Sequence, residues 1–180
     1  GAFAITAGLE QMIEYIDNLK FTDEDIEYLR SLHIFEDDFL EYLRSFKFTG
    51  DIYAIPEGTV VFPREPLVKV IAPIMEAQLV ETAILTMINH QSLIATKAAR
   101  VVNAARGDGI MEFGLRRAQG PDAGTYGARA AMIGGCIGTS NVLTGQLFDV
   151  PVLGTHAHSW IMSFPDEYTA FKTYAKMYPD

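Results

Sequence analysis

The chain has 180 residues, of which 49% are hydrophobic, so it is long enough and apolar enough for one sizeable domain or two small ones. Its 14 Lys and Arg residues against 23 Asp and Glu residues give a formal net charge of −9, which argues against duplex nucleic acid as a partner. Cys136 is the only cysteine, so no disulfide can form within the chain, and we expect a reducing, cytoplasmic location.

The first part of the chain is predicted to be rich in short helices. After a strand at 2–6, the spacing of the apolar residues predicts three helices, at 7–19, 23–32 and 36–46. Thr22 and Asp25 have the spacing of a capping box at the start of the second helix. The polar faces of these helices mix charges without convergence, so we expect them to be scaffold.

A small antiparallel β unit and a long helix are predicted next. Residues 51–62, interrupted by Pro56-Glu57-Gly58, are predicted to form a β-hairpin, and 66–72 a further strand. The helix at 74–106 is apolar on more than one face, so we expect it to be buried between layers or to bridge two domains or two subunits. It is too polar for a membrane span, because it carries Glu76, Gln78, Glu81, Asn89 and His90.

The second part of the chain alternates between strands and helices. Strands are predicted at 110–115, 136–139 and 150–153, and helices at 123–133, at 141–148 and from Trp160 onward. Three short strand-helix units in succession predict a parallel sheet and favour a barrel or half-barrel. We therefore expect an N-terminal α+β domain with the long helix at 1–106, and the first units of an α/β barrel at 107–180.

The third predicted strand leads into the most polar segment of the chain. Residues 150–153 are predicted to be a short buried strand, and Ser159 is expected to cap a helix that starts at Trp160. His156 and His158 lie between them. Each histidine has three possible roles: a packed or hydrogen-bonded residue without chemistry, half of a metal-binding pair, or an acid, base or nucleophile.

The carboxyl ends of parallel strands meet at one edge of a sheet, so the polar residues that follow these strands are expected to surround one cavity. They are Glu112, Arg116 and Arg117, then Thr139, Ser140 and Asn141, then Thr155, His156, His158 and Ser159. We expect at least one of the two arginines to bind a carboxylate or phosphate, although each could instead form a salt bridge with Glu112 or Asp122. Gly134, Gly135 and Gly138 could bring backbone N–H groups close to an anion.

The same strand ends carry three extended blocks: E-F-G-L-R-R-A-Q-G-P-D at 112–122, G-G-C-I-G-T-S-N-V-L-T-G at 134–145 and G-T-H-A-H-S-W at 154–160. Together they resemble the nicotinate phosphoribosyltransferase family, and weaker similarity at 46–58 and in the long helix extends the resemblance over essentially the whole chain. It implies an α/β protein of the type II phosphoribosyltransferase kind, an incomplete α/β barrel with an added helical and antiparallel-β domain. It also implies a homodimer with the site at its interface.

The resemblance assigns roles to individual residues. His158 matches the family histidine that ATP phosphorylates, which makes it the expected catalytic residue. Arg116 matches an arginine at the pyridine pocket, Phe113 lies beside it, and Thr155 matches a residue that contacts nicotinate. Ser140 stands where related nicotinamide enzymes have an aspartate; a neutral hydroxyl suits a carboxylate ligand, whereas an aspartate would accept from an amide.

The activity implied is an enzymatic step of NAD biosynthesis: nicotinate mononucleotide forms from nicotinate and phosphoribosyl pyrophosphate, with ATP hydrolysis through a phosphohistidine. ATP and Mg²⁺ are the implied cofactors, the Mg²⁺ being held on pyrophosphate, and no metal site is expected within the chain. The partners expected are these small molecules, with neither nucleic acid nor a membrane among them.

Two departures from the family pattern qualify the resemblance. Ile137 stands where the glycine-rich block usually carries an aspartate. The family's N-terminal aromatic segment, later acidic strand and C-terminal glycine-rich phosphate loop are also missing from these residues. We therefore expect the chain to be a fragment that is inactive by itself.

Three rival functions are kept. A metal-dependent hydrolase of the amidohydrolase type would use the His-x-His pair, but His33 and His90 lie upstream in predicted helices and would not complete its ligands. A non-catalytic relative would explain Ile137. Phosphoribosyl transfer to nicotinamide or quinolinate is the most closely related alternative activity, and Ser140 argues against nicotinamide as the base.

Overall fold

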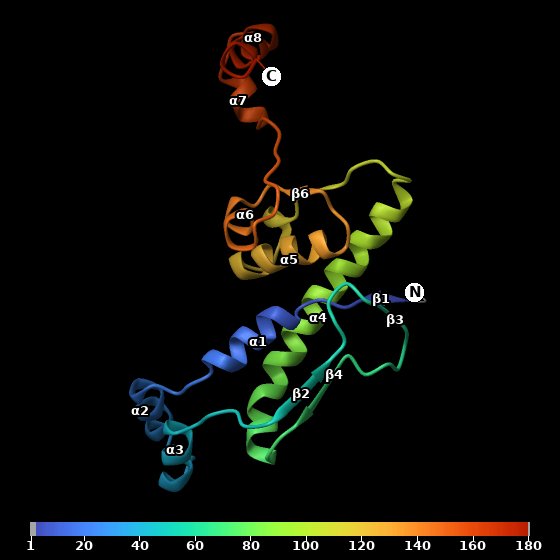
Figure 1. The fold of residues 1–180 in the computed structure, drawn as a ribbon. Helices are drawn as coiled ribbons and strands as arrows, with labels where there is room; N and C mark the ends of the chain where they lie inside the picture. Colours follow the sequence, from blue (N-terminus) through green and yellow to red (C-terminus); the bar gives the residue numbers. More distant parts are fainter. Residues whose placement is uncertain (1–2, 180) are drawn as a thin grey trace.

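The computed structural model describes residues 3–179, and most of the other elements are arranged along one long helix, α4 (Ile74–Ala104) (Figure 1). The predicted long helix is thus confirmed. Val80, Ile84 and Ala95 are buried on it, at positions spread over most of its length. Among the described residues, no helix is both long enough and apolar enough to cross a membrane.

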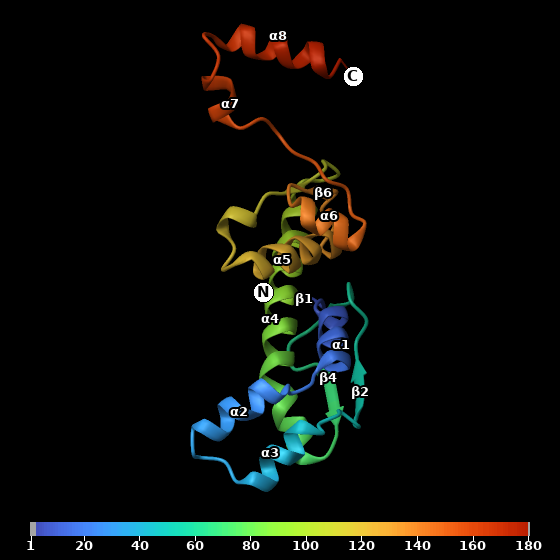
Figure 2. The same cartoon turned by 90° about the vertical axis from the view of Figure 1, so that its left-hand side faces the viewer.

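The N-terminal half of α4 is covered by a helix and a two-stranded sheet. Helix α1 (Leu9–Asn18) buries Met12 and Ile16 against Val80 and Ile84 of α4. Strands β2 (Asp51–Ala54) and β4 (Val68–Ile71) pair antiparallel and add apolar side chains to the same cluster (Figure 2).

Helices α2 (Asp23–Ser31) and α3 (Asp37–Arg44) form a smaller cluster around Ile26, Leu40 and Leu43 at one end of the molecule. The predicted capping box is present, since the Thr22 N–H donates to Asp25 Oδ2 at 2.7 Å and the Asp25 N–H donates to Thr22 Oγ1 at 3.2 Å. Periodicity and capping therefore predicted all three short helices within one to two residues at most boundaries.

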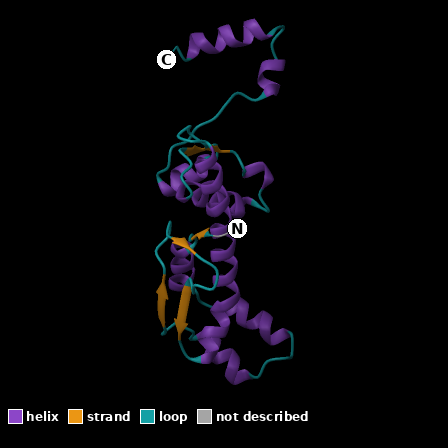
Figure 3. Ribbon diagram, turned by 90° about the vertical axis from the view of Figure 1, so that its right-hand side faces the viewer, coloured by secondary structure: helices purple, strands orange, loops and turns teal. Residues whose placement is uncertain are grey.

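The predicted hairpin at 51–62 is wrong. Strand β2 pairs with β4, while β3 (Val60–Val61) pairs antiparallel with β1 (Ala4–Ile5), the N-terminal strand (Figure 3). The turn at Pro56-Glu57-Gly58 is real, but it sends the chain across to a new partner, because the Gly58 N–H donates to the Thr6 carbonyl at 2.8 Å. Turn chemistry identifies a turn without identifying what the following strand pairs with.

Strand β1 also bonds to α4 through side chains. The Ile5 N–H donates to Thr96 Oγ1 at 2.8 Å, and the Ala7 N–H donates to Ser92 Oγ at 3.1 Å. These hydroxyls lie in the buried face of α4, so backbone donors that β1 leaves unpaired in its short ladder find partners on the helix.

The second half contains the predicted parallel strands. Strand β5 (Met111–Glu112) is followed by the 3₁₀ turn η1 (Leu115–Arg117) and α5 (Pro121–Ile133), and β6 (Gly138–Thr139) by α6 (Val142–Phe148). β5 pairs parallel with β6, and Thr139 forms a parallel bridge with Val152. The parallel arrangement is confirmed; within residues 3–179 it does not close into a barrel. The domain division at 106–107 remains a prediction.

The third strand and its helix differ from expectation. Residues 150–153 form only the bridge to β6, and Val152 is 46% exposed, so the predicted buried strand is wrong. This segment lies at the edge of the sheet. Two hydrogen bonds join it to Thr139, one donated by the Thr139 N–H and one donated by the Leu153 N–H. Helix α7 (His158–Met162) begins two residues early with Ala157 as its N-cap, so Ser159 does not cap it.

Helix α7 and the helix that follows it, α8 (Glu167–Met177), stand away from the rest of the chain at the end of the extended segment (Figure 2). His33, expected in a helix, lies in the turn after α2 with a positive φ of 54°, whereas His90 is helical as expected. His90 Nε2 lies 3.2 Å from the Ala123 carbonyl and so contacts the start of α5.

Helix α5 packs closely on the C-terminal half of α4 through small residues. A Cβ added at Gly134 would lie 2.5 Å from the Ala95 carbonyl oxygen and 2.7 Å from Ala98 Cβ. Gly138 is equally confined, because its Cβ would lie 2.6 Å from Leu153 Cδ1. These two glycines are needed for close approach of backbones, which is a packing reason for the glycine-rich block.

Replacing Gly134 with Ala is expected to lower the free energy of unfolding by about 1–3 kcal/mol, because the methyl group must displace the α4 backbone. Urea denaturation followed by far-ultraviolet circular dichroism measures this. Gly154→Ala is the matched control: nothing lies within 4 Å of its Cβ position, so we expect a change within about 0.5 kcal/mol. Equal losses in the two variants would contradict the close-packing argument.

Candidate functional site

The candidate site lies at the carboxyl edge of the parallel strands. Glu112 pairs in register with Thr139, so Phe113 and Ser140 are the next residues on neighbouring strands and leave the sheet at the same edge. The Leu153 N–H donates to the Thr139 carbonyl at 2.9 Å, which sets the third strand end alongside. The structure thus brings Phe113 and Ser140 together as the sequence predicted.

Glu112 joins the first two strand ends through its side chain. Its Oε2 accepts from Thr139 Oγ1 at 2.6 Å, and its Oε1 accepts from the Gly114 N–H. Its backbone carbonyl accepts from the Ser140 N–H at 3.0 Å. The carboxylate is therefore engaged by backbone and hydroxyl donors, and the predicted alternative of a salt bridge from Arg116 or Arg117 to Glu112 is not formed.

Arg116 lies in the short turn η1, which is held against α5. A Cβ at Gly124 of α5 would lie 2.5 Å from Leu115 Cδ1, so Leu115 sits tightly on that helix. Arg116 itself is exposed, and within residues 3–179 no carboxylate lies in ion-pair distance of its guanidinium. Phe113, three residues before Arg116, is itself 44% exposed, so an anion can reach the guanidinium from solvent.

The segment after Ser140 is fixed by α6. Asn141 is the N-cap of this helix, and its Oδ1 accepts from the Thr144 N–H at 3.3 Å. The Asn141 N–H donates to Thr139 Oγ1 at 3.0 Å, and Thr144 Oγ1 donates to the Thr125 carbonyl at 3.2 Å. Ser140 therefore lies, half-buried, between two residues whose backbones are held in place.

The two histidines of the His-x-His pair have different surroundings. The ring of His156 packs against Trp160 and Tyr174, with centroids 5.3 Å and 3.9 Å away, in an aromatic cluster that joins α7 to α8. His158 is the first residue of α7, is exposed, and forms no side-chain hydrogen bond within the described part of the chain. His156 thus has aromatic contacts that His158 lacks among the described residues, although both side chains are exposed.

Thr155 lies in the segment without regular secondary structure that follows Leu153, His158 is the first residue of α7, and both are exposed. In residues 3–179, no hydrogen bond joins either of them to the Phe113–Arg116 segment or to Ser140. The structure therefore brings three of the five predicted site residues to one edge, and the roles assigned to all five stay predictions.

Other candidate groups are inert here. Cys136 is buried, and this burial together with the charge of Glu112 raises the pKa of its thiol, which disfavours the reactive thiolate. In the described range 3–179 there is no cluster of three or more His, Cys, Asp or Glu side chains that could hold a metal ion.

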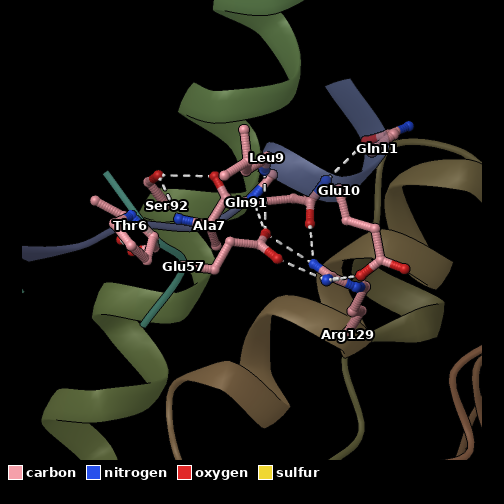
Figure 4. A network of polar contacts seen from close by, with 11 residues as sticks. Thr6, Ala7, Leu9, Glu10, Gln11, Glu57, Gln91, Ser92 and Arg129 are labelled. Atoms are coloured by element: carbon pink, nitrogen blue, oxygen red, sulfur yellow. Dashed lines mark hydrogen bonds and ion pairs between the residues drawn. The ribbon is translucent and has the colours of Figure 1, made fainter. Parts of the chain in front are cut away.

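Sequence reasoning missed a polar network that joins the segment after β1, the turn at Glu57, α1, α4 and α5 (Figure 4). Arg129 of α5 donates to both carboxylate oxygens of Glu57, at 2.9 and 2.7 Å, and also pairs with Glu10. Glu57 Oε1 accepts from the N–H groups of Gly8 and Leu9 at 2.6 and 3.1 Å. A lone arginine in a helix otherwise rich in Gly and Ala was the available signal.

Glu57 and Arg129 are mostly buried, with side chains 18% and 11% exposed. Burial by itself raises the pKa of Glu57, but the hydrogen bonds and charge of Arg129 and the two backbone donors together lower that pKa below its ordinary value of 4.5. The network thus uses Arg129 for structure, which removes it from the basic residues available to an anionic ligand.

Two models of one family match the chain. The N-terminal domain of nicotinate phosphoribosyltransferase matches residues 1–89, and the nicotinate phosphoribosyltransferase family model matches residues 109–176. The chain belongs to the nicotinate phosphoribosyltransferase family. Residues 90–108, which neither match covers, comprise the C-terminal half of α4 and the turn after it.

Relatives of known name agree with this assignment. The chain is 52% identical to nicotinate phosphoribosyltransferase of Bacillus subtilis and 48% identical to that of Mycobacterium tuberculosis, each over 178 residues and 99% of the chain. These alignments cover 36% and 38% of the relatives, so the chain spans little more than a third of their length.

Solved structures show the same fold. The crystal structure of human nicotinic acid phosphoribosyltransferase superposes with a TM-score of 0.84 at 40% identity, covering 91% of this chain and 34% of that one. Nicotinate-nucleotide pyrophosphorylase from Pyrococcus furiosus superposes with a TM-score of 0.76 at 26% identity, covering 96% of this chain and 37% of that one. The fold is thus of the phosphoribosyltransferase type that the three blocks indicated.

Glu57 should make stability depend on pH. Its pKa is lower in the folded than in the unfolded state, so its contribution to the free energy of unfolding is present above about pH 4.5 and is lost as the pH falls through the folded pKa. In Glu57→Gln we expect a shallower loss of stability on acidification, measured by urea denaturation at a series of pH values. Glu27→Gln, on the exposed face of α2, is the control and should keep the original slope. If the two variants lose stability with the same dependence on pH, this account of Glu57 is contradicted.

Proposed function

We propose that the chain is part of a nicotinate phosphoribosyltransferase that joins nicotinate to phosphoribosyl pyrophosphate in a reaction coupled to ATP hydrolysis. The observation that carries the proposal is the paired strand ends: within a chain of this family, Phe113 and Ser140 follow residues paired in register, and the unpaired guanidinium of Arg116 lies three residues from Phe113. We also propose the finer architecture, an incomplete α/β barrel with an added N-terminal domain, in a cytoplasmic homodimer.

The proposed pyridine pocket divides its work among three residues. The exposed face of Phe113 offers an apolar surface on which the ring of nicotinate can stack. Arg116 supplies a planar guanidinium that suits the carboxylate of nicotinate. Ser140 adds a neutral hydroxyl that can donate to that carboxylate without repelling it. The pyridine nitrogen would then be free to form the bond to C1 of the ribose as pyrophosphate leaves.

His158 is proposed to take the phosphoryl group of ATP, and Thr155 to contact nicotinate. A ring nitrogen of neutral His158 would attack the γ-phosphorus; the bond to the β–γ bridging oxygen breaks and ADP leaves. Exposure of His158 at the start of α7 leaves this nitrogen accessible. Attack of water on the phosphorus then breaks the P–N bond, releases inorganic phosphate and returns the free imidazole.

Mg²⁺ is expected to enter with the polyphosphate substrates. The described residues offer it no cluster of three or more His, Cys, Asp or Glu side chains, so no step is assigned here to a metal held by this chain. The hydrolase alternative would need further ligands beside the His-x-His pair, and residues 3–179 do not supply them as a cluster.

The first experiment tests the longer natural protein that contains this sequence. With ATP, Mg²⁺, phosphoribosyl pyrophosphate and nicotinate, we expect nicotinate mononucleotide and ADP. His158→Ala should reduce ATP-coupled turnover at least about tenfold, because the nucleophile is gone. The control His156→Phe keeps an aromatic ring in the cluster and should stay within about threefold of the wild type. Turnover that survives in His158→Ala would refute the phosphohistidine step.

Ser140→Asp tests the choice of base. A carboxylate at this position would repel the carboxylate of nicotinate and accept from the amide of nicotinamide, so kcat/KM for nicotinate should fall about a hundredfold and the preference should shift toward nicotinamide. Ser140→Ala is the control, with a smaller loss for nicotinate and no gain for nicotinamide. An unchanged preference in Ser140→Asp would remove Ser140 from the specificity argument and favour the neighbouring activities.

A further inference from the structure

Glu112 has an arrangement that its predicted place at the site edge does not explain. It is half-buried, and its two carboxylate oxygens are directed to two different strand ends, the Gly114 N–H on one side and Thr139 Oγ1 on the other. A Cβ at Gly114 would lie 2.6 Å from Glu112 Oε1, which shows how closely the carboxylate is seated on the turn. Neither oxygen bonds to a guanidinium in the described residues.

The backbone alone holds these strand ends weakly. Strands β5 and β6 are two residues long each, and the bonds between them include Ile137 N–H to the Ile110 carbonyl at 2.9 Å and Ser140 N–H to the Glu112 carbonyl at 3.0 Å. After Glu112 the backbone leaves strand β5 and enters η1, where the described residues form no further strand pairing. The carboxylate supplies the missing link between the turn that carries Arg116 and the strand end that carries Ser140.

The hydrogen-bond pattern calls for an acceptor with two oxygens. The Asn141 N–H donates to Thr139 Oγ1 at 3.0 Å, and that hydroxyl donates its proton on to Glu112 Oε2 at 2.6 Å. The other oxygen receives a backbone N–H. Hydrogen bonds to an ionised acceptor are about twice as strong as neutral ones, and a glutamine would turn an NH₂ group toward one of these donors.

We infer that Glu112 is a positioning residue, which sets the distance between the Phe113–Arg116 segment and Ser140 so that both can contact one nicotinate. The inference rests on the proposed function. Since a displacement of about 1 Å at a binding segment can cost up to about a hundredfold in rate, a carboxylate that ties both segments has a direct effect on base binding without touching the base.

Because Glu112 carries a negative charge, the direction in which nicotinate KM changes distinguishes two possible roles of this residue. A negative charge near the site repels nicotinate, so if Glu112 acted only through its charge, Glu112→Gln would lower the KM for nicotinate. If Glu112 holds the two segments in place, the same variant raises that KM, because one of the two links is lost. The two roles thus predict opposite changes from one substitution.

The experiment uses the longer natural protein and measures nicotinate KM, kcat and ATP hydrolysis without nicotinate. For Glu112→Gln we expect nicotinate KM to rise about tenfold, while ATP hydrolysis without nicotinate stays within about twofold, because His158 lies on a different segment. Thr139→Val removes the hydroxyl, and with it the bond to Glu112 and the bond from the Asn141 N–H, so nicotinate KM should rise here too. Thr139→Ser keeps the hydroxyl and should restore the wild-type KM.

Each outcome decides the matter. An unchanged or lowered KM in Glu112→Gln overturns the positioning role, and so does an equal loss of ATP hydrolysis, which would indicate general disruption. If Glu112→Gln does not fold, Thr139→Val against Thr139→Ser gives the same decision, since only the positioning role predicts that the hydroxyl matters for KM. If the wild-type protein forms no nicotinate mononucleotide, the proposed function itself is overturned. If the wild type is active and Glu112→Gln has the same nicotinate KM, only the positioning role of Glu112 is overturned.

Discussion

The close contact between α4 and α5 is the constraint on which the structure depends. Gly134 leaves no room for a side chain against Ala95 and Ala98, so the two helix backbones approach as near as packing allows. The same stretch of α4 bonds β1 through Ser92 and Thr96. One helix therefore holds both the N-terminal strand and the first helix of the parallel unit, whose buried side chains meet in one cluster around Ala95, and the position of the candidate site depends on this contact.

The Glu57–Arg129 network secures the contact with polar groups. Arg129 extends from α5 to the turn after β2 and to α1, while the Glu57 carboxylate caps the start of α1 by accepting from Gly8 and Leu9. A carboxylate at a helix N-terminus and a guanidinium with two carboxylate partners satisfy charges that would otherwise be costly to bury. Segments that are far apart in the sequence are thereby joined at one place.

The helices, the capping box and the parallel strands could be predicted, whereas the antiparallel strand pairing in the first part of the chain could not. The capping box at Thr22, the 31-residue helix α4 and the parallel order of β5 and β6 follow from periodicity, capping and the strand-helix alternation. The pairing of β3 with β1 could not, because a turn signal at Gly58 does not say which distant edge the next strand will find. Exposure of Val152 was missed for a related reason, since an apolar run does not show whether it lies at the centre of a sheet or at its edge.

The site divides in the same way. Phe113 and Ser140 could be placed together because parallel register carries two sequence blocks to one edge, and the free guanidinium of Arg116 follows from the engagement of Glu112 elsewhere. The histidines could not be told apart by spacing; both are exposed, and only the aromatic contacts of His156 with Trp160 and Tyr174 distinguish it from His158. Spacing delivers both imidazoles to the same segment, and the packing of a side chain from the later helix α8, Tyr174, is what gives His156 its different surroundings.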